Sequence, residues 1–156
     1  MRIIISVVSD LVTDQRVHRT ATTLSGTGHE VILVGRRKSE SQDISRSYKT
    51  VRFKLWWEKG ALFYAAYNIR LFFFLLFNKV DVLVSNDLDT LLPNYLISKL
   101  KGAKLYYDAH EYFTEVPELV SRPKIQKIWK NIERWIFPKL AHVWTVNDSI
   151  AKLYRD

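Results

Sequence analysis

The sequence predicts an α/β fold, a Rossmann-like, doubly wound parallel sheet with helices on both faces. Two observations predict it. Short runs of apolar, often β-branched residues alternate along the chain with segments of helical periodicity, which is the pattern of repeated strand–helix–strand units. Several of these runs are continuously apolar, as expected for strands buried on both faces. We expect a single domain over residues 1–156, long enough to bury a substantial core.

Residues 3–34 predict the first strand–helix–strand unit. Residues 3–8 form the first β-branched run, and residues 31–34 form the second. Between them, Asp14 is placed to cap a helix that continues to Leu24, with Gly26 or Gly28 as its stop. A crossover of this length connects neighbouring parallel strands with right-handed geometry.

The remaining segments continue the alternation. After a polar loop at residues 36–48, we expect strands at 51–55, 80–84, 105–107 and 143–146, and helices at 60–77, 91–100 and 125–136, with Ser149 as the N-cap of one more. Gly102 is the expected stop of the helix at 91–100. We expect the six strands to follow the doubly wound order 3-2-1-4-5-6.

The composition limits the kinds of partner and site that the chain can have. The chain carries 24 Lys and Arg against 16 Asp and Glu, a formal charge of +8, which favours anionic partners. It has no cysteine, so disulfides, thiolate metal sites and a thiol nucleophile are excluded. The four histidines lack metal-binding spacing, and no Walker, Gly-x-Gly-x-x-Gly or Gly-x-Ser-x-Gly motif occurs. We therefore expect no metal and no bound prosthetic group.

Polar side chains follow three of the predicted strands. Asp108, His110 and Glu111 come directly after the run at 105–107, and Asn86 and Asp87 follow the run at 80–84. A third group, Ser9 and Asp10, follows the first strand. Because the carboxyl ends of parallel strands meet at one edge of a sheet, where ligands bind in such folds, we expect these side chains to face one crevice.

Several motifs in order along the chain resemble a known family. They are Asp14-Gln15-Arg16-Val17, Gly28-His29-Glu30-Val31, Asn86-Asp87, Tyr107-Asp108-Ala109-His110-Glu111 and the segment from Trp144 to Ile150. Together they resemble the N-terminal domain of GT-B-fold glycosyltransferases, particularly the large retaining family 4. The chain departs from many relatives after the first strand, where Ser9-Asp10-Leu11-Val12-Thr13 contains no glycine pair.

The resemblance implies a function shared between two domains. This chain would be the acceptor-binding half of an enzyme that moves a sugar from a nucleotide-sugar donor to a glycan or lipid-linked acceptor. The C-terminal donor-binding domain, with its Glu-x7-Glu element, is absent from this chain, so the chain alone is expected to be inactive. The resemblance also implies retention of configuration, no metal, and a nucleotide-sugar donor as substrate.

The resemblance also implies roles for the crevice residues. His110 and Glu111 are the candidate catalytic residues: an imidazole can donate a hydrogen bond to a sugar and stabilise charge as the bond breaks, and Glu111 can orient it or accept a hydroxyl proton. Ser9, Asp10, Asn86 and Asp87 are the candidate acceptor-binding residues. The alternatives are structural: a His bonded to a neighbouring loop, a surface Glu111, and Asp87 or Asp89 as the cap of the following helix.

Basic residues are candidates for contact with an anion or a lipid headgroup. They are Arg16 in the first helix and, on one face of the amphipathic segment 125–136, Lys127, Lys130 and Arg134. The apolar helix at 60–77 is expected to pack on the sheet, and a helix at the bilayer interface is the alternative. We expect a cytoplasmic protein, at most peripheral on the inner face of the membrane.

Two other classes of function remain open. A stand-alone Rossmann-like module that binds a nucleotide or an anionic ligand without catalysis is the main alternative, although the chain has no glycine-rich phosphate loop. Nucleic-acid binding ranks last, because the basic residues are scattered and form no recognition motif.

Overall fold

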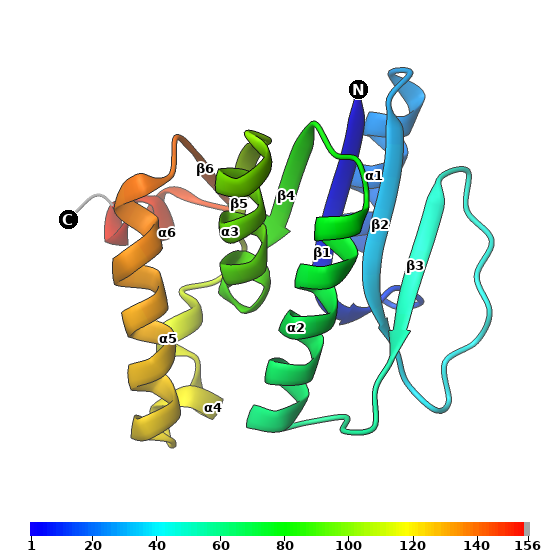
Figure 1. Cartoon of the computed structure of the whole chain (residues 1–156). Helices are drawn as coiled ribbons and strands as arrows, with labels where there is room; N and C mark the ends of the chain where they lie inside the picture. Colours follow the sequence, from blue (N-terminus) through cyan, green and yellow to red (C-terminus); the bar gives the residue numbers. More distant parts are fainter. Residues whose placement is uncertain (155–156) are drawn as a thin grey trace.

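The computed structural model describes residues 1–154 and shows one six-stranded, all-parallel sheet (Figure 1). The strands are hydrogen-bonded in the order β3-β2-β1-β4-β5-β6, which confirms the predicted order. Their bounds are β1 (Arg2–Asp10), β2 (Glu30–Arg37), β3 (Lys49–Lys54), β4 (Val82–Asn86), β5 (Lys104–Ala109) and β6 (His142–Thr145).

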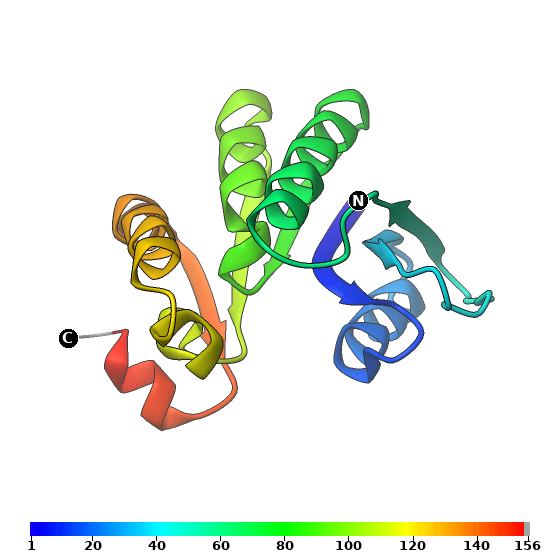
Figure 2. The same ribbon diagram turned by 90° about the horizontal axis from the view of Figure 1, so that it is seen from below.

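Helices cover both faces of the sheet. They are α1 (Gln15–Gly26), α2 (Ala61–Phe77), α3 (Leu91–Lys101), α4 (Pro117–Val120), α5 (Pro123–Ile136) and α6 (Asp148–Leu153). Figure 2 shows α2, α3 and α5 together on one side of the sheet, and α1 and α6 on the other. The doubly wound α/β architecture predicted from the sequence is thereby confirmed.

Alternate residues of the central strands enter separate cores. Ile3 and Ile5 of β1 pack with Val17 of α1, whereas Ile4 points to the other face and packs with Tyr67 and Leu71 of α2. A third core joins α3, α5 and β5. Because β1 is buried on both faces, its near-continuous apolar sequence is the one that a central parallel strand requires.

The first helix begins and ends as the sequence predicts. The Asp14 side chain accepts a hydrogen bond from the Val17 N–H at 3.3 Å, which caps α1. The helix ends at Gly26, and Gly28 has φ +82°, a backbone conformation that favours glycine. Gly102 likewise ends α3 with φ +68°.

Two predicted caps are wrong. The N-cap of α6 is Asn147, whose Oδ1 accepts from the Ile150 N–H at 2.9 Å, so Ser149 lies inside the helix. Neither Asp87 nor Asp89 caps the helical segment after β4, where a short 3₁₀ turn at Leu88–Thr90 leads into α3. The backbone turns into α3 without a side-chain cap, and both carboxylates are left for other contacts.

The apolar helix α2 lies on the sheet, as expected. Its inner side buries Phe63, Tyr67, Leu71 and Leu75, spaced so that they share one helical face. The Tyr67 hydroxyl donates to the Val7 carbonyl at 2.6 Å, which ties α2 to β1. Among the helices of residues 1–154, none combines the length and the apolar character needed to cross a bilayer.

Candidate active site at the carboxyl edge of the sheet

His110 lies directly after β5, between two carboxylates. Its Nε2 is 3.1 Å from Asp108 Oδ2 and its Nδ1 is 3.5 Å from Asp87 Oδ2. The imidazole is largely buried, with 9% of the side chain exposed. The predicted convergence of the two strand ends is therefore seen in the structure, since β4 supplies Asp87 through its following turn and β5 supplies Asp108 and His110.

The two carboxylates make His110 a cation at neutral pH. Burial of the ring opposes its charge, but the neighbouring carboxylates of Asp108 and Asp87 outweigh burial and raise the pKa of His110 to about 9. The contact from Nδ1 to Asp87 is long, and Nδ1 makes no proper hydrogen bond within the protein. Nδ1 is shielded from solvent, so the charge of the ring, fixed by the two carboxylates, is what His110 presents to the crevice.

Asp87 also fixes the backbone of His110. Its Oδ1 accepts from the His110 N–H at 2.9 Å, and its own N–H donates to the Asp108 carbonyl at 2.9 Å. Asp87 has φ 60° and ψ 170°, and among residues 1–154 it is the only non-glycine with positive φ. That region costs a side-chain-bearing residue about 1–3 kcal/mol and occurs preferentially at functional sites. The strained turn places the Asp87 carboxylate against His110 instead of leaving it free for an acceptor.

Asp89 is a site residue that the sequence analysis considered only as a helix cap. Its Oδ1 is shielded from solvent and has no hydrogen-bond partner within the protein. Burial, together with the negative charges of Asp87 and Glu111, raises the pKa of Asp89 well above its usual range. The residue lines a cavity of about 330 Å³ with Ser9, Arg36 and Tyr64. A carboxyl group held in this way can exchange hydrogen bonds with a hydroxyl of a ligand.

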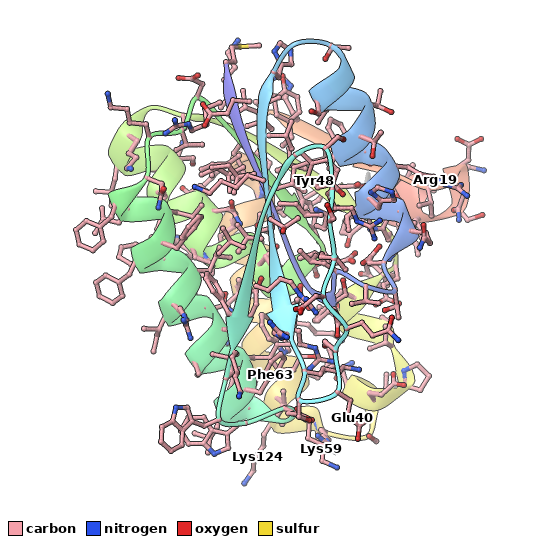
Figure 3. All side chains as sticks on the ribbon, turned by 90° about the vertical axis from the view of Figure 1, so that its right-hand side faces the viewer. Arg19, Glu40, Tyr48, Lys59, Phe63 and Lys124 are labelled. Atoms are coloured by element: carbon pink, nitrogen blue, oxygen red, sulfur yellow. The ribbon has the colours of Figure 1, made fainter. Side chains whose placement is uncertain are left out.

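A larger cavity of about 600 Å³ opens beside the first. The two cavities share Lys59, Gly60 and Tyr64, and Glu111 lines the larger one. Burial and the charge of Asp87 raise the pKa of Glu111. Figure 3 shows Lys59 and Lys124 projecting from the same end of the molecule. The rest of the larger cavity is mainly apolar and is lined by Phe113, Val116, Leu119, Ile125 and Trp129.

The other candidate acceptor residues have partners within the protein. Both oxygens of Asp10 are engaged: Oδ1 by the Val12 N–H and by Arg52 at 3.2 Å, and Oδ2 by the Ser41 hydroxyl. Asn86 is buried and donates to the Ser6 carbonyl at 3.1 Å. These contacts favour structural roles for Asp10 and Asn86.

Ser9 is the candidate acceptor residue that still lines the crevice. Its hydroxyl donates to Asp14 Oδ2 at 2.5 Å, so it supports the cap of α1, yet it also lines the smaller cavity. Arg36 follows the second predicted strand and is a candidate for contact with a phosphate, but the sequence does not place Arg36 and Asp89 together with Ser9 in this cavity. The available signal was their position, because Arg36 lies near the carboxyl end of β2 and Asp89 follows β4.

The four candidate basic contacts lie in two places. Arg16 is exposed on α1, near enough to Glu111 to lower that residue's pKa against the larger effect of burial. Lys127, Lys130 and Arg134 lie on α5, on the other side of the sheet (Figure 2). Lys130 is paired with Glu115 at 2.6 Å, whereas Lys127 and Arg134 are exposed.

Within residues 1–154, no group of three or more His, Cys, Asp and Glu side chains is arranged to hold a metal ion. Carboxylates, hydroxyls and basic side chains line the two cavities in this part of the chain, and the His110 imidazolium directly precedes Glu111 of the larger one. Such a set can bind polyhydroxylated ligands and stabilise negative charge.

Comparison with known proteins identifies the family. The model of Glycosyltransferase Family 4 matches residues 14–156, which includes the crevice residues from Asp14 onward. The chain belongs to glycosyltransferase family 4. The resemblance seen in the order of the sequence motifs is confirmed by this match. No match was found among curated proteins.

A solved structure shows the same fold as this family 4 chain. The apo structure of UGT2 from Phytolacca americana superposes with a TM-score of 0.52 at 12% sequence identity. The match covers 78% of this chain and 33% of that one, so this chain spans about a third of the length of the plant protein. At this level of identity the likeness concerns the α/β fold.

Proposed function

We propose that this chain is the acceptor-binding half of a glycosyltransferase that moves a sugar from a nucleotide-sugar donor to a glycan or lipid-linked acceptor. The observation that carries the proposal is His110, held as a buried cation between Asp87 and Asp108 at the carboxyl edge of the sheet. Membership of glycosyltransferase family 4 supports the reaction class.

In this proposal His110 stabilises the charge that develops on the leaving nucleotide diphosphate. As the bond from the sugar to the diphosphate breaks, negative charge grows on the leaving oxygen, and a fixed imidazolium lowers the energy of that state. The charge of the ring acts on the leaving group through space, because Nδ1 is shielded from solvent. Asp108 holds Nε2 and keeps the ring in place, so Asp87 and Asp108 are positioning residues.

The acceptor occupies the two adjoining cavities, with its reactive hydroxyl near His110. Ser9 and Asp89 supply hydrogen-bonding groups in the smaller cavity, and Glu111 does so at the larger one. The apolar wall of the larger cavity around Phe113 and Trp129 suits the non-polar part of a lipid-linked acceptor. Reaction with retention of configuration and without a metal is part of the same proposal, by analogy with the family.

A second domain completes the cleft in this account and supplies the nucleotide-binding groups. The chain alone is then expected to bind acceptor weakly and to transfer no sugar. A cytoplasmic location is part of the proposal, because a chain without cysteine has no disulfide that needs an oxidising compartment.

The test is to sequence the native transcript beyond Asp156 and to assay its full product. Radiolabelled nucleotide sugars, supplied with a lipid extract or oligosaccharides, should give a labelled acceptor with the full product and none with residues 1–156. If the full product carries no second α/β domain and releases no nucleotide from any donor, the proposal fails. Binding of a free nucleotide without turnover would point instead to a non-catalytic module.

A further inference from the structure

The outward side of α2 carries large apolar side chains exposed to solvent. Leu62, Ile69, Phe73 and Phe77 are 60%, 60%, 51% and 80% exposed. They recur at intervals of seven and four, so they form one stripe down the helix, opposite the buried stripe that contains Leu71. From Leu62 to Phe77 the stripe extends roughly 22 Å along the helix. The inner side of α2 packs on the core of this protein. A solvent-facing side that is also apolar indicates a second binding partner outside the protein.

The stripe continues across the neighbouring helices of the same layer. A cavity of about 210 Å³ between α2 and α3 is lined mainly by Ile69, Phe72, Phe73 and Leu96. Leu100 of α3 and Ile128 and Trp135 of α5 are also exposed. Figure 1 shows these three helices side by side in front of the sheet. We call the outward side of α2, α3 and α5 the helical face.

The charges of the helical face have one sign. The three helices contain seven Lys and Arg and a single acidic residue, Glu133. Glu133 does not offset them at the surface, because it is half-buried and accepts hydrogen bonds from Tyr154 and Thr114. Lys124, Lys127 and Arg134 of α5 are exposed. Exposed apolar groups beside unopposed cations are the combination that binds anionic lipid surfaces.

Two tryptophans lie where this face meets the crevice. Trp56 and Trp57 precede the N-terminus of α2 and are 96% and 49% exposed, and Lys59 follows them. Tryptophan is enriched at membrane–water interfaces because one part of its ring system is apolar and its N–H can remain in contact with polar groups. The other face of the sheet differs: the exposed residues of α1 are Gln15, Arg16, Arg19, Thr22, Thr23 and Gly26.

We infer that the helical face docks on the surface of an anionic lipid bilayer, with the apolar stripe of α2 inserted among the headgroups and the cations of α5 on the lipid phosphates. A second copy of the chain is a poorer occupant, because pairing two such faces would bring like charges together. Since Lys59 and Gly60 at the start of α2 line the larger cavity, the crevice opens next to the lipid surface in this orientation. The binding itself does not depend on the proposed sugar transfer.

The test is sedimentation of the purified protein with lipid vesicles, which needs no enzymatic activity. Vesicles of phosphatidylcholine with about one-third phosphatidylglycerol should bind the protein at least about tenfold more tightly than pure phosphatidylcholine vesicles. The double variant Phe73→Ser/Phe77→Ser should weaken that binding by about tenfold or more, through lost apolar insertion. Thermal melting should show both variant and parent folded, because these two rings are largely exposed.

Two double variants, each lacking two cations on one face of the sheet, test which face binds the lipid. Lys127→Gln/Arg134→Gln removes two cations from α5 and should weaken binding by about tenfold. Arg19→Gln/Lys152→Gln removes two exposed cations from α1 and α6 on the other face and should leave binding unchanged. Equal losses from both pairs, or no binding of the parent to anionic vesicles, would overturn the inference. So would a dimer in solution that Phe73→Ser/Phe77→Ser converts to a monomer, because a second copy would then cover the face.

Discussion

Asp87 holds His110 at two points: its Oδ1 accepts from the His110 backbone N–H at 2.9 Å, and its Oδ2 lies 3.5 Å from the imidazole Nδ1. The first contact fixes the chain after β5, and the second places a negative charge beside the ring. Both come from a residue with positive φ, so the turn after β4 bears backbone strain at this point. The geometry makes the protonation of His110 depend on Asp87.

Replacement of Asp87 tests that dependence. Asp87→Asn keeps the size of the side chain and removes its charge, so the pKa of His110 should fall from about 9 by about one unit. Titration of the His110 ring followed by NMR measures it. Asp43→Asn, a change at an exposed carboxylate paired with Arg37, is the control and should leave that pKa unchanged. An unchanged value in Asp87→Asn would mean that Asp108 alone sets it.

The stability of the fold should depend on alkaline pH through His110. The pKa of His110 is raised in the folded state to about 9, so its contribution is complete below about pH 6.5 and is lost as pH rises through 9. Denaturant unfolding between these values should show a loss of about 2–3 kcal/mol. In His110→Gln this part of the pH dependence should vanish. An equal slope in the variant would show that other groups cause it.

Asp89 should lower the stability of the protein at neutral pH. Its pKa is raised, mainly by burial, so the ionised form is disfavoured in the folded state and stability falls as pH rises above the pKa of the unfolded chain. Asp89→Asn should therefore stabilise the protein by about 1 kcal/mol and weaken acceptor binding. Thermal melting measures the first effect. Glu40→Gln, at an exposed position, is the control and should change neither.

Gly35 in β2 should not tolerate a side chain. A Cβ at this position would lie within about 3 Å of the Leu11 side chain and of the Ser9 carbonyl, both in or next to the crevice. Gly35→Ala should destabilise the fold by about 1–3 kcal/mol. Gly26→Ala, where a Cβ meets no atom within 4 Å, is the matched control. A similar melting temperature for both variants would mean that the loop after β1 adjusts without cost.

The sheet order could be predicted from the sequence because each strand is a short apolar run separated from the next by a helix or a loop. Such a pattern leaves few topologies once right-handed crossovers are required. The meeting of Asp87, Asp108 and His110 follows from the same logic, since strand ends of β4 and β5 are neighbours in that order. The cap at Asp14 could be predicted from its place just before the first apolar residue of α1. Asn147, Asp148 and Ser149 stand in a row, and the sequence does not show that Asn147 is the one that caps α6.

The burial and the raised pKa of Asp89 could not be predicted, because they depend on packing between segments that are distant in the sequence. The Asn68 side chain of α2 donates to the Asp89 carbonyl at 2.9 Å, and the residue is covered by elements that the sequence does not place relative to each other. The partners of Asp10 could not be predicted for the same reason. Ser41 lies in a loop and Arg52 in β3, both far from Asp10 in the sequence. Exposure of the outward stripe of α2 is likewise a tertiary property, because its sequence is apolar on all sides.

The most direct test of the central claim is the rate of sugar transfer by the native-length protein with His110→Ala. The proposal predicts a fall of about a hundredfold or more in kcat with an unchanged fold, because the fixed cation at the crevice is lost. His142→Ala is the control: that exposed histidine begins β6 at the opposite end of the sheet and should retain the parent rate. A transfer rate for His110→Ala close to that of the parent would contradict the assignment of this crevice as the place of reaction.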